Sequence, residues 1–219
     1  CTLVRIDMGR HLLLINVHHV AFDGASEAVL HRDLGAVYRA LQQGGTVADA
    51  MLAELPVQYV DFALWQCGDA LAPLLQGSRE YWRAQLREGA LPVLELPFDL
   101  PRPAQQTFDG DHVPIVLDGD VTTRLLALGR EHGCTPFQAV LALWAVVLCR
   151  HAGQEEVVIG SPYHGRDAAG SESLIGYFVN MLALRVEVPH GGSVGAALRG
   201  ARVVASEGMR HASVPFQQV

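Results

Sequence analysis

The most constraining feature of this sequence is an apolar segment, Ala139 to Cys149, which follows a strong helix-start signal. Thr135 is a good N-cap residue, Pro136 suits the first turn, and Gln138 completes a capping box. The helix that begins here is apolar on nearly every side, so we expect it to be buried. It is too short to cross a bilayer and is closed by Arg150. The rest of the chain must therefore supply elements that cover this helix.

Hydrophobic periodicity and turn residues predict the other elements, which mix strands and helices without strict alternation. A hairpin is expected over residues 3–17, where an alternating strand, a turn and an apolar strand follow one another. Further strands are expected at 112–118, 156–162 and 180–188. Helices are expected at 26–41, 57–66, 78–89, 120–132 and 193–209. The predicted class is α/β with mixed sheets.

Composition narrows the class of protein further. Half of the 219 residues are hydrophobic and 18% are charged, so a real core is expected and global disorder is not. The net charge of −7 argues weakly against a nucleic-acid partner, because neutralising phosphates needs clustered basic residues. The four cysteines lack the spacing of a zinc site or a disulfide framework, so buried free thiols are expected. Without a signal peptide or a bilayer-spanning run, we expect a cytoplasmic protein with no membrane partner.

A histidine pair closes the second strand of the predicted hairpin, in the stretch INVHHVAFDG. Neighbouring residues of a strand point to opposite faces, so one histidine is expected to be reactive and the other packed. His19 is nearer the loop and is the candidate for an open cleft, while His18 is expected to be packed. Asp23 can either orient an imidazole or pair with an arginine and lock the loop. Gly24 permits a backbone conformation or a close approach that other residues forbid.

Several chemistries are compatible with this motif taken alone. A neutral histidine is well suited to accept a proton near neutral pH, so His19 is a candidate general base. Gly-x-Ser-x-Gly, Walker-type and Gly-x-Gly-x-x-Gly motifs are absent, which favours direct deprotonation of a substrate nucleophile. A zinc site would need a third ligand, and the spacing is not that of His-Glu-x-x-His. Ordinary packing or exposure of both histidines is the plain alternative.

Longer stretches of the chain resemble a known family. HHVAFDG is similar to the His-His-x-x-x-Asp-Gly signature of the chloramphenicol acetyltransferase-like superfamily, which includes the condensation domains of nonribosomal peptide synthetases. YVDFALWQ, EYWRAQL, LELPFDLPRP, IGSPYHGRD, LIGYFVNMLALR and HASVPFQQV resemble further segments of condensation domains, in the same order. The resemblance runs from end to end of the chain.

This resemblance implies a two-lobed, chloramphenicol acetyltransferase-like α/β fold with mixed sheets and a tunnel between the lobes. Residues 1–45 would be the end of the N-terminal lobe, with the histidine motif, and residues 46–219 would be most of the C-terminal lobe. The chain begins without methionine and ends in PFQQV. We therefore expect an internal piece of a longer protein, truncated at both ends.

The resemblance also implies a reaction. Such domains join an acyl or peptidyl thioester to the amine of an aminoacyl thioester, and both arrive on the 4'-phosphopantetheine arms of carrier proteins. No cofactor or metal would be bound by the domain itself. Its partners would be upstream and downstream carrier proteins and an adjacent adenylation domain. His19 would handle the amine, His18 and Gly24 would support the motif, and Asp23 would pair with an arginine, for which Arg166 is the candidate.

Two positions depart from the family's usual pattern. Ala25 stands where relatives often have tryptophan, and His164 stands where they often have alanine. We expect His164 to be a tolerated loop residue rather than a second base. The aromatic residues are expected to pack helices rather than bind substrate; they are Tyr59, Trp65, Tyr81, Trp82, Trp144 and Phe178.

Alternative functions within this resemblance are an epimerisation domain and a non-catalytic module that docks carrier proteins or tailoring enzymes. An intact His19 and Gly24 argue against the docking module. A heterocyclisation domain is disfavoured, because that group has aspartate in place of the first histidines.

Overall fold

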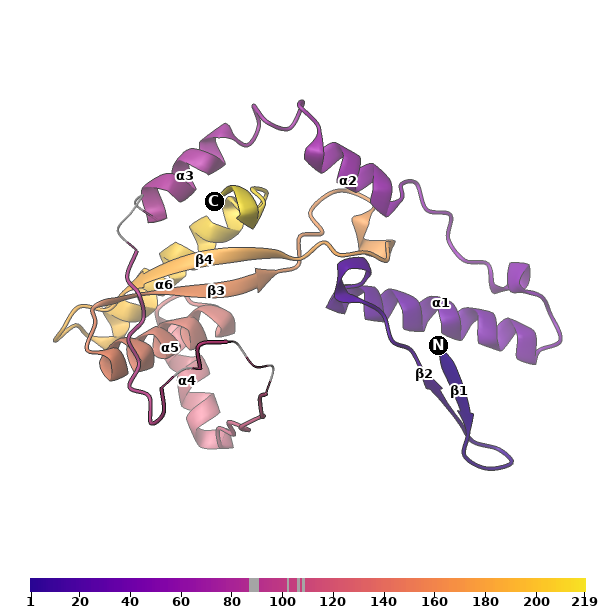
Figure 1. Cartoon of the computed structure of the whole chain (residues 1–219), viewed down its shortest axis with the longest axis horizontal. Coiled ribbons are helices and arrows are strands. Elements are labelled where there is room, and N and C mark those ends of the chain that lie inside the picture. The colour runs from indigo at the N-terminus through magenta and orange to yellow at the C-terminus, as the bar shows by residue number, and fades with distance from the viewer. Residues whose placement is uncertain (87–90, 102, 106, 108) are drawn as a thin grey trace. The chain divides into compact units, whose positions relative to one another are not determined.

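A computed structural model describes residues 1–86, 91–101, 103–105, 107 and 109–219 of the chain (Figure 1). The chain divides into two compact units. The first unit contains residues 1–75 and 164–180, and the second contains residues 76–163 and 181–219. The two are described in turn.

The first unit begins with the expected hairpin. Strand β1 (Thr2–Arg5) pairs antiparallel with β2 (His11–Leu14), and Thr2 lies opposite Leu14. Beyond the hairpin come a single 3₁₀ turn over His19–Ala21 and helix α1 (Gly24–Gln42). A 3₁₀ turn (Val47–Ala50), helix α2 (Tyr59–Cys67) and another 3₁₀ turn (Ser171–Ser173) complete the unit.

The expectation that the histidines end a strand is wrong. β2 stops at Leu14, four residues before His18, and His18 instead caps the 3₁₀ turn. Helix α1 begins two residues earlier than predicted because Asp23 caps it. The Asp23 side chain accepts the Ser26 N–H, and Ser26 Oγ accepts the Asp23 N–H in return. The two histidines are therefore placed by a turn and a helix start rather than by strand alternation.

The second unit packs helices against two paired strands. Its helices are α3 (Gln76–Leu86), α4 (Gly119–Glu131), α5 (Pro136–Ala152) and α6 (Val194–Arg210). Strands β3 (Glu156–Tyr163) and β4 (Asn180–Glu187) lie side by side (Figure 1), and a last 3₁₀ turn spans Phe216–Gln218. The Val188 N–H donates to the Glu155 carbonyl, so the end of β4 meets the start of β3. Arg185 of β4 also pairs with Glu156 of β3.

The core of this unit lies where α5 packs on α6. Ala142 and Ala145 of α5 and Ala201 and Ala205 of α6 are fully buried, and such small side chains let two helices approach closely. Leucine and valine from β4 and α6 fill the remaining space; they are Leu184, Val186 and Leu198, each at most 1% exposed. The expected helix at 135–149 is thus a central element of the fold.

Two predictions about this unit are wrong. Helix α5 is not buried all round, because Val140 is 54% exposed and Trp144 is 46% exposed. Residues 112–118 form no strand; Val113 and Val116 are more than four-fifths exposed, and no described strand pairs with the segment. A strand pattern is realised only where a partner takes its backbone hydrogen bonds.

Aromatic residues of α3 pack as expected. Trp82 is 2% exposed and donates from Nε1 to the His211 carbonyl at 3.0 Å. The Tyr81 ring stacks on the His211 imidazole with a centroid separation of 4.2 Å. Burial, together with the charge of Glu207, raises the pKa of Tyr81. The predicted end of this helix, at residues 87–89, lies outside the described residues.

The remaining expectations concern domains, thiols and membrane spans. The compact units do not coincide with segments 1–45 and 46–219, so that division into lobes stays a prediction. Cys134 and Cys149 are buried free thiols, whereas Cys1 and Cys67 are exposed.

None of the described helices is long and apolar enough to cross a membrane alone. Helices α4 and α5 pass the length and composition test only as a pair, with a 103° bend between them.

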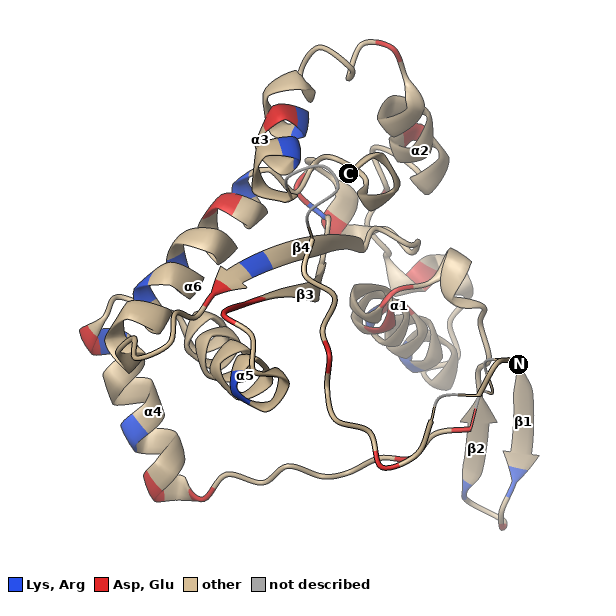
Figure 2. Ribbon diagram, turned by 60° about the vertical axis from the view of Figure 1, so that its left-hand side comes forward, with Lys and Arg blue, Asp and Glu red and all other residues tan. Residues whose placement is uncertain are grey.

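Charged residues are distributed over both units (Figure 2). Basic residues occur on α1, α3, α4 and α6 rather than on a single described element, with acidic residues among them. The formal net charge of −7 is thus spread over the chain.

The start of α5 gives a test of the fold. Thr135 Oγ1 accepts the Gln138 N–H at 3.3 Å, and Gln138 Oε1 accepts the Thr135 N–H at 2.9 Å. Thr135→Ala should lower the free energy of unfolding by about 1 kcal/mol, because one N–H of the first turn loses its acceptor. Urea unfolding followed by circular dichroism measures this loss. Thr135→Ser keeps the oxygen and serves as the control. An equal loss of unfolding free energy in both variants would show that the capping hydrogen bond does not contribute to stability.

Candidate active site

His19 lies in the turn between β2 and α1, with an exposed side chain. Its Nδ1 is 2.7 Å from the Phe22 carbonyl oxygen. Because a carbonyl oxygen only accepts hydrogen bonds, Nδ1 carries the proton in this contact. In the neutral ring the lone pair then lies on Nε2, which is the nitrogen able to take a proton from a substrate. The backbone of the turn thus fixes the tautomer that a general base needs.

His18 does not have the predicted packed environment. Its side chain is exposed, and its Nδ1 accepts the Val20 N–H at 3.1 Å. This bond caps the 3₁₀ turn that carries His19. Within the described residues His18 therefore supports the motif by shaping the turn, not by filling a core.

Asp23 and Arg166 form the ion pair that was expected between them. Arg166 Nη2 donates to Asp23 Oδ1 at 2.7 Å, and the two side chains are 6% and 1% exposed. Arg166 Nη1 donates to two backbone carbonyls, those of Ser171 at 2.6 Å and Leu174 at 2.8 Å. The guanidinium also lies 4.2 Å above the Phe178 ring, within cation–π range. The pair therefore ties the start of α1 to the segment 164–178.

Ser26 is a member of this network that sequence reasoning missed. Its Oγ accepts hydrogen bonds from Arg166 Nη2 and from the Gly176 N–H, both at 3.0 Å. Its hydroxyl proton has two acceptors in reach, Asp23 Oδ1 at 2.8 Å and the Gly176 carbonyl at 2.9 Å. The side chain is completely buried. A serine three residues after an N-cap aspartate was a capping signal available in the sequence.

Asp23 does not orient His19. Its Oδ1 is used by Arg166 and Ser26, and its Oδ2 accepts the Phe178 N–H at 3.1 Å. Burial on its own raises the pKa of Asp23, but the hydrogen bonds from Arg166, Ser26 and the Phe178 backbone outweigh it and hold the pKa below its usual value. Two roles were expected for Asp23, orienting an imidazole or pairing with an arginine to lock the loop. The structure shows the second.

Glycine is required at two positions of this site, but not at the one predicted. Gly24 has no left-handed backbone angle, and a Cβ there would meet nothing within 4 Å, so the expected reason for Gly24 is wrong among the described residues. A Cβ on Gly165, at φ +65°, would collide with the Phe178 carbonyl. A Cβ on Gly176 would collide with the Tyr59 ring. These two contacts explain the glycines of HGRD and LIGYFV.

Aromatic rings surround the ion pair and His19. Tyr59 of α2 packs edge-on against Phe178, with ring centroids 5.1 Å apart, which agrees with its predicted packing role. The Tyr59 hydroxyl donates to the Tyr177 carbonyl at 2.8 Å. The Tyr177 ring meets the His19 imidazole at 85°, with centroids 5.2 Å apart. Trp65, also predicted to pack, is 49% exposed.

His164, the departure from the family pattern, lies in the loop that follows β3. Its side chain is exposed, and its Nδ1 accepts the Arg166 N–H at 3.0 Å. This contact is compatible with the predicted loop role and leaves the ion pair of Arg166 unchanged.

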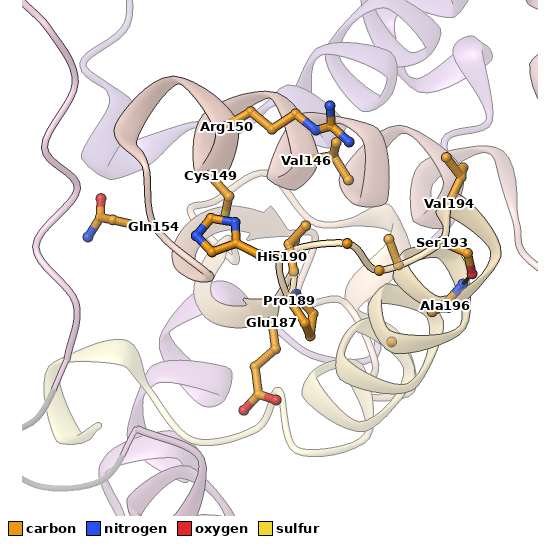
Figure 3. Close-up of a pocket in the computed structure, with 15 residues that line it drawn as sticks. Val146, Cys149, Arg150, Gln154, Glu187, Pro189, His190, Ser193, Val194 and Ala196 are labelled. Atoms are coloured by element: carbon orange, nitrogen blue, oxygen red, sulfur yellow. Dashed lines mark hydrogen bonds between the residues drawn. The ribbon is translucent and has the colours of Figure 1, made fainter.

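A cavity of about 580 Å³ lies in the second unit, and none of its lining residues belongs to the histidine motif (Figure 3). It is lined by Cys149, Arg150, Glu187 and His190 among others, and in this view Arg150 and Glu187 lie on opposite sides. Its size suits a small ligand, but these groups do not converge on one point. Among the described residues, no group of three or more histidine, cysteine and acidic side chains is placed to hold a metal ion. We therefore assign the candidate site to His19 and its surroundings.

The ion pair can be tested by its effect on stability. Asp23→Asn should lower the free energy of unfolding by about 3–5 kcal/mol, because Arg166 stays buried without a countercharge. Urea unfolding measures the loss. Asp33→Asn is the matched control, since Arg32 and Asp33 are also 2.7 Å apart but lie at the surface, where water screens the pair. A similar cost in both variants would contradict the structural role of the buried pair.

The lowered pKa of Asp23 predicts a dependence of stability on pH. In the unfolded chain Asp23 titrates near its ordinary value of about 4, and in the folded chain it titrates lower. Its contribution to stability is therefore complete above about pH 4 and is lost as the pH falls through the folded pKa. Measured from pH 7 to pH 3, the difference in unfolding free energy between wild type and Asp23→Asn should shrink. A constant difference would show that the pKa of Asp23 is the same in the folded and the unfolded chain.

Comparison with known proteins places this geometry in a family. A family model described as "Condensation domain" matches residues 1–219. Malpinin synthetase of Mortierella alpina is 39% identical over 208 residues, which are 95% of this chain and 3% of that protein. Phosphinothricin tripeptide synthetase PhsC of Streptomyces viridochromogenes is 39% identical over 219 residues, which are all of this chain and 20% of that protein. The chain thus spans a small part of each of these relatives.

Two solved structures share the fold. The X-domain in its complex with OxyB from teicoplanin biosynthesis is 28% identical, with a TM-score of 0.80 over 92% of this chain and 45% of that one. The first condensation domain of the calcium-dependent antibiotic synthetase is 25% identical, with a TM-score of 0.72 over 98% of this chain and 48% of that one. The predicted α/β fold is confirmed, and the chain spans less than half of each solved chain. It belongs to the condensation-domain family of nonribosomal peptide synthetases.

Proposed function

We propose that the protein containing this chain forms an amide bond between a carrier-bound acyl or peptidyl thioester and the amine of a carrier-bound aminoacyl acceptor. Membership of the condensation-domain family supports an acyl-transferring role. The observation that carries the proposal is the hydrogen bond between His19 Nδ1 and the Phe22 carbonyl, which leaves Nε2 as the basic nitrogen of a neutral ring. That nitrogen is the group we assign to the acceptor amine.

The proposed step balances without an external reagent. The amine nitrogen attacks the thioester carbonyl, a C–N bond forms, and the C–S bond breaks. The amine loses one proton, which Nε2 of His19 accepts and the leaving thiolate then receives. Because the thioester is already activated, the site must mainly hold two tethered substrates together, which accounts for about 7–11 kcal/mol in well-oriented reactions. A positioned base adds about 10²- to 10⁴-fold to the rate.

The ion pair contributes indirectly to this reaction. Asp23 caps α1 and is the neighbour of Phe22, the residue whose carbonyl holds the His19 ring. By fixing Asp23 against Arg166 and the Phe178 backbone, the network fixes where that carbonyl points. We therefore assign Asp23 and Arg166 to structural support, together with His18, whose side chain caps the turn that carries His19.

Substrates and partners follow from the same proposal. The domain binds no cofactor of its own, and both substrates arrive on 4'-phosphopantetheine arms. Its partners are an upstream and a downstream carrier protein and an adjacent adenylation domain in a larger synthetase. The length of malpinin synthetase, of which this chain matches 3%, supports such an assembly.

One observation favours a second candidate function. The X-domain, which shares this fold at a TM-score of 0.80, forms a complex with the protein OxyB. The same fold is therefore also found in a domain that binds a partner protein. The oriented imidazole of His19 favours catalysis, because a module that only docks partners does not need a fixed tautomer.

The deciding experiment uses the full-length protein with two loaded carrier proteins and mass spectrometry of the carrier-bound product. The wild type should give a condensed dipeptidyl thioester, and His19→Ala should lower the rate by about 10²- to 10⁴-fold, because the proton acceptor is lost. His31→Ala, which removes an exposed histidine of α1, should keep the wild-type rate.

Other outcomes would point elsewhere. Inverted stereochemistry without chain growth would indicate epimerisation. Carrier binding without any turnover, in wild type and variants alike, would indicate a docking module.

A further inference from the structure

We propose that Tyr177 is a positioning residue that holds the His19 imidazole in its productive orientation. The proposal rests on the proposed function, in which His19 meets the acceptor amine. It begins from the edge-to-face contact of the two rings, with centroids 5.2 Å apart and planes at 85°. This is a preferred geometry for an aromatic pair.

The backbone on both sides of Tyr177 is anchored to the start of α1. Gly176 donates its N–H to Ser26 Oγ at 3.0 Å, and its carbonyl accepts the Asp23 N–H at 3.1 Å. Phe178 donates its N–H to Asp23 Oδ2 at 3.1 Å. Tyr177 therefore stands between two residues that hydrogen bonds fix to the segment following His19.

The carbonyl of Tyr177 is held as well. It accepts the hydroxyl of Tyr59 at 2.8 Å, and the Tyr59 ring fills the space left by the absent side chain of Gly176. Burial, with the charge of Asp23, raises the pKa of Tyr59, so this hydroxyl stays protonated and able to donate. Hydrogen bonds thus hold the backbone of all three residues from 176 to 178. The half-buried side chain of Tyr177 therefore extends from a backbone that is fixed in position.

The imidazole needs this second contact. The Phe22 carbonyl holds one corner of the ring through Nδ1, but a single hydrogen bond leaves the ring free to tilt about that point. The Tyr177 ring packs against the imidazole and limits this tilt. Together the two contacts set the direction in which Nε2 points. Near-attack geometry is sensitive to displacements of about 1 Å, so loss of the ring should lower turnover.

A plain packing role for Tyr177 is the competing explanation. Packing alone would change stability and leave the chemistry of folded protein unchanged. Positioning would change the turnover number of folded protein and the environment of His19. The two are separated by Tyr177→Phe, which keeps the ring, and Tyr177→Leu, which removes it while keeping an apolar side chain.

The test uses the full-length protein with loaded carriers. Tyr177→Leu should lower kcat by roughly 2- to 10-fold, the range that the energy of an aromatic contact allows, with KM for the loaded acceptor carrier unchanged within a factor of about 2. Tyr177→Phe, which keeps the ring, should keep the wild-type kcat. Equal kcat in wild type and Tyr177→Leu would overturn the proposal, and so would a loss confined to KM.

A second readout does not depend on activity. With ¹³C-labelled histidine, the His19 ring signal is identified by its disappearance in His19→Ala. Ring currents should give it the same shift in wild type and Tyr177→Phe and a different one in Tyr177→Leu. An unchanged shift would overturn the proposal. If the wild type makes no amide but the shift moves as expected, the proposed function fails while the positioning of His19 by Tyr177 stands.

Discussion

The buried ion pair between Asp23 and Arg166 is the interaction on which the rest of the site depends. It joins residues 143 positions apart, and each partner has further bonds that use its charge. Asp23 caps α1, where the helix dipole favours an anion, and Arg166 takes two backbone carbonyls of the loop beyond it. Two charges without these extra partners would be costly to bury. The surrounding loops offset this cost with hydrogen bonds to both partners, although the buried Nε of Arg166 has none among the described residues.

The charged groups of this network, Asp23 and Arg166, hold the loop in place, and the proposed chemistry belongs to a different residue, His19. In Ser-His-Asp sites a carboxylate holds the histidine and stabilises the imidazolium that forms. Here both oxygens of Asp23 are occupied by other donors, and a neutral carbonyl, that of Phe22, holds His19. A histidine held this way has a fixed tautomer, with the lone pair of its neutral ring on Nε2. Such a base suits the proposed reaction, in which an activated thioester meets an amine that is itself a good nucleophile.

Local features of the chain were predictable from sequence, because they depend on neighbouring residues. The cap of α5 at Thr135 and the hairpin before the histidines are two features that were predicted correctly in this way. Features that depend on distant residues were not: the outer face of α5 is exposed because no described element covers it, and residues 112–118 have no strand partner among the described strands. The pairing of Asp23 with Arg166 came from the family resemblance, which carries long-range contacts that periodicity does not.

The same reasoning explains which site residues were missed and which departures from the family are tolerated. Ser26 and Tyr177 act through contacts with segments about 150 residues away. The capping position of Ser26 was visible in the sequence, but its distant contacts were not, and no local pattern marks Tyr177. Ala25, in contrast, has an exposed side chain, and His164 Nδ1 accepts the backbone N–H of Arg166 rather than a guanidinium N–H. The side-chain hydrogen bonds of the ion pair described above come from other residues. What the fold requires of this region is therefore the set of buried donors and acceptors, together with glycine at Gly165 and Gly176, where a side chain would collide with Phe178 and Tyr59.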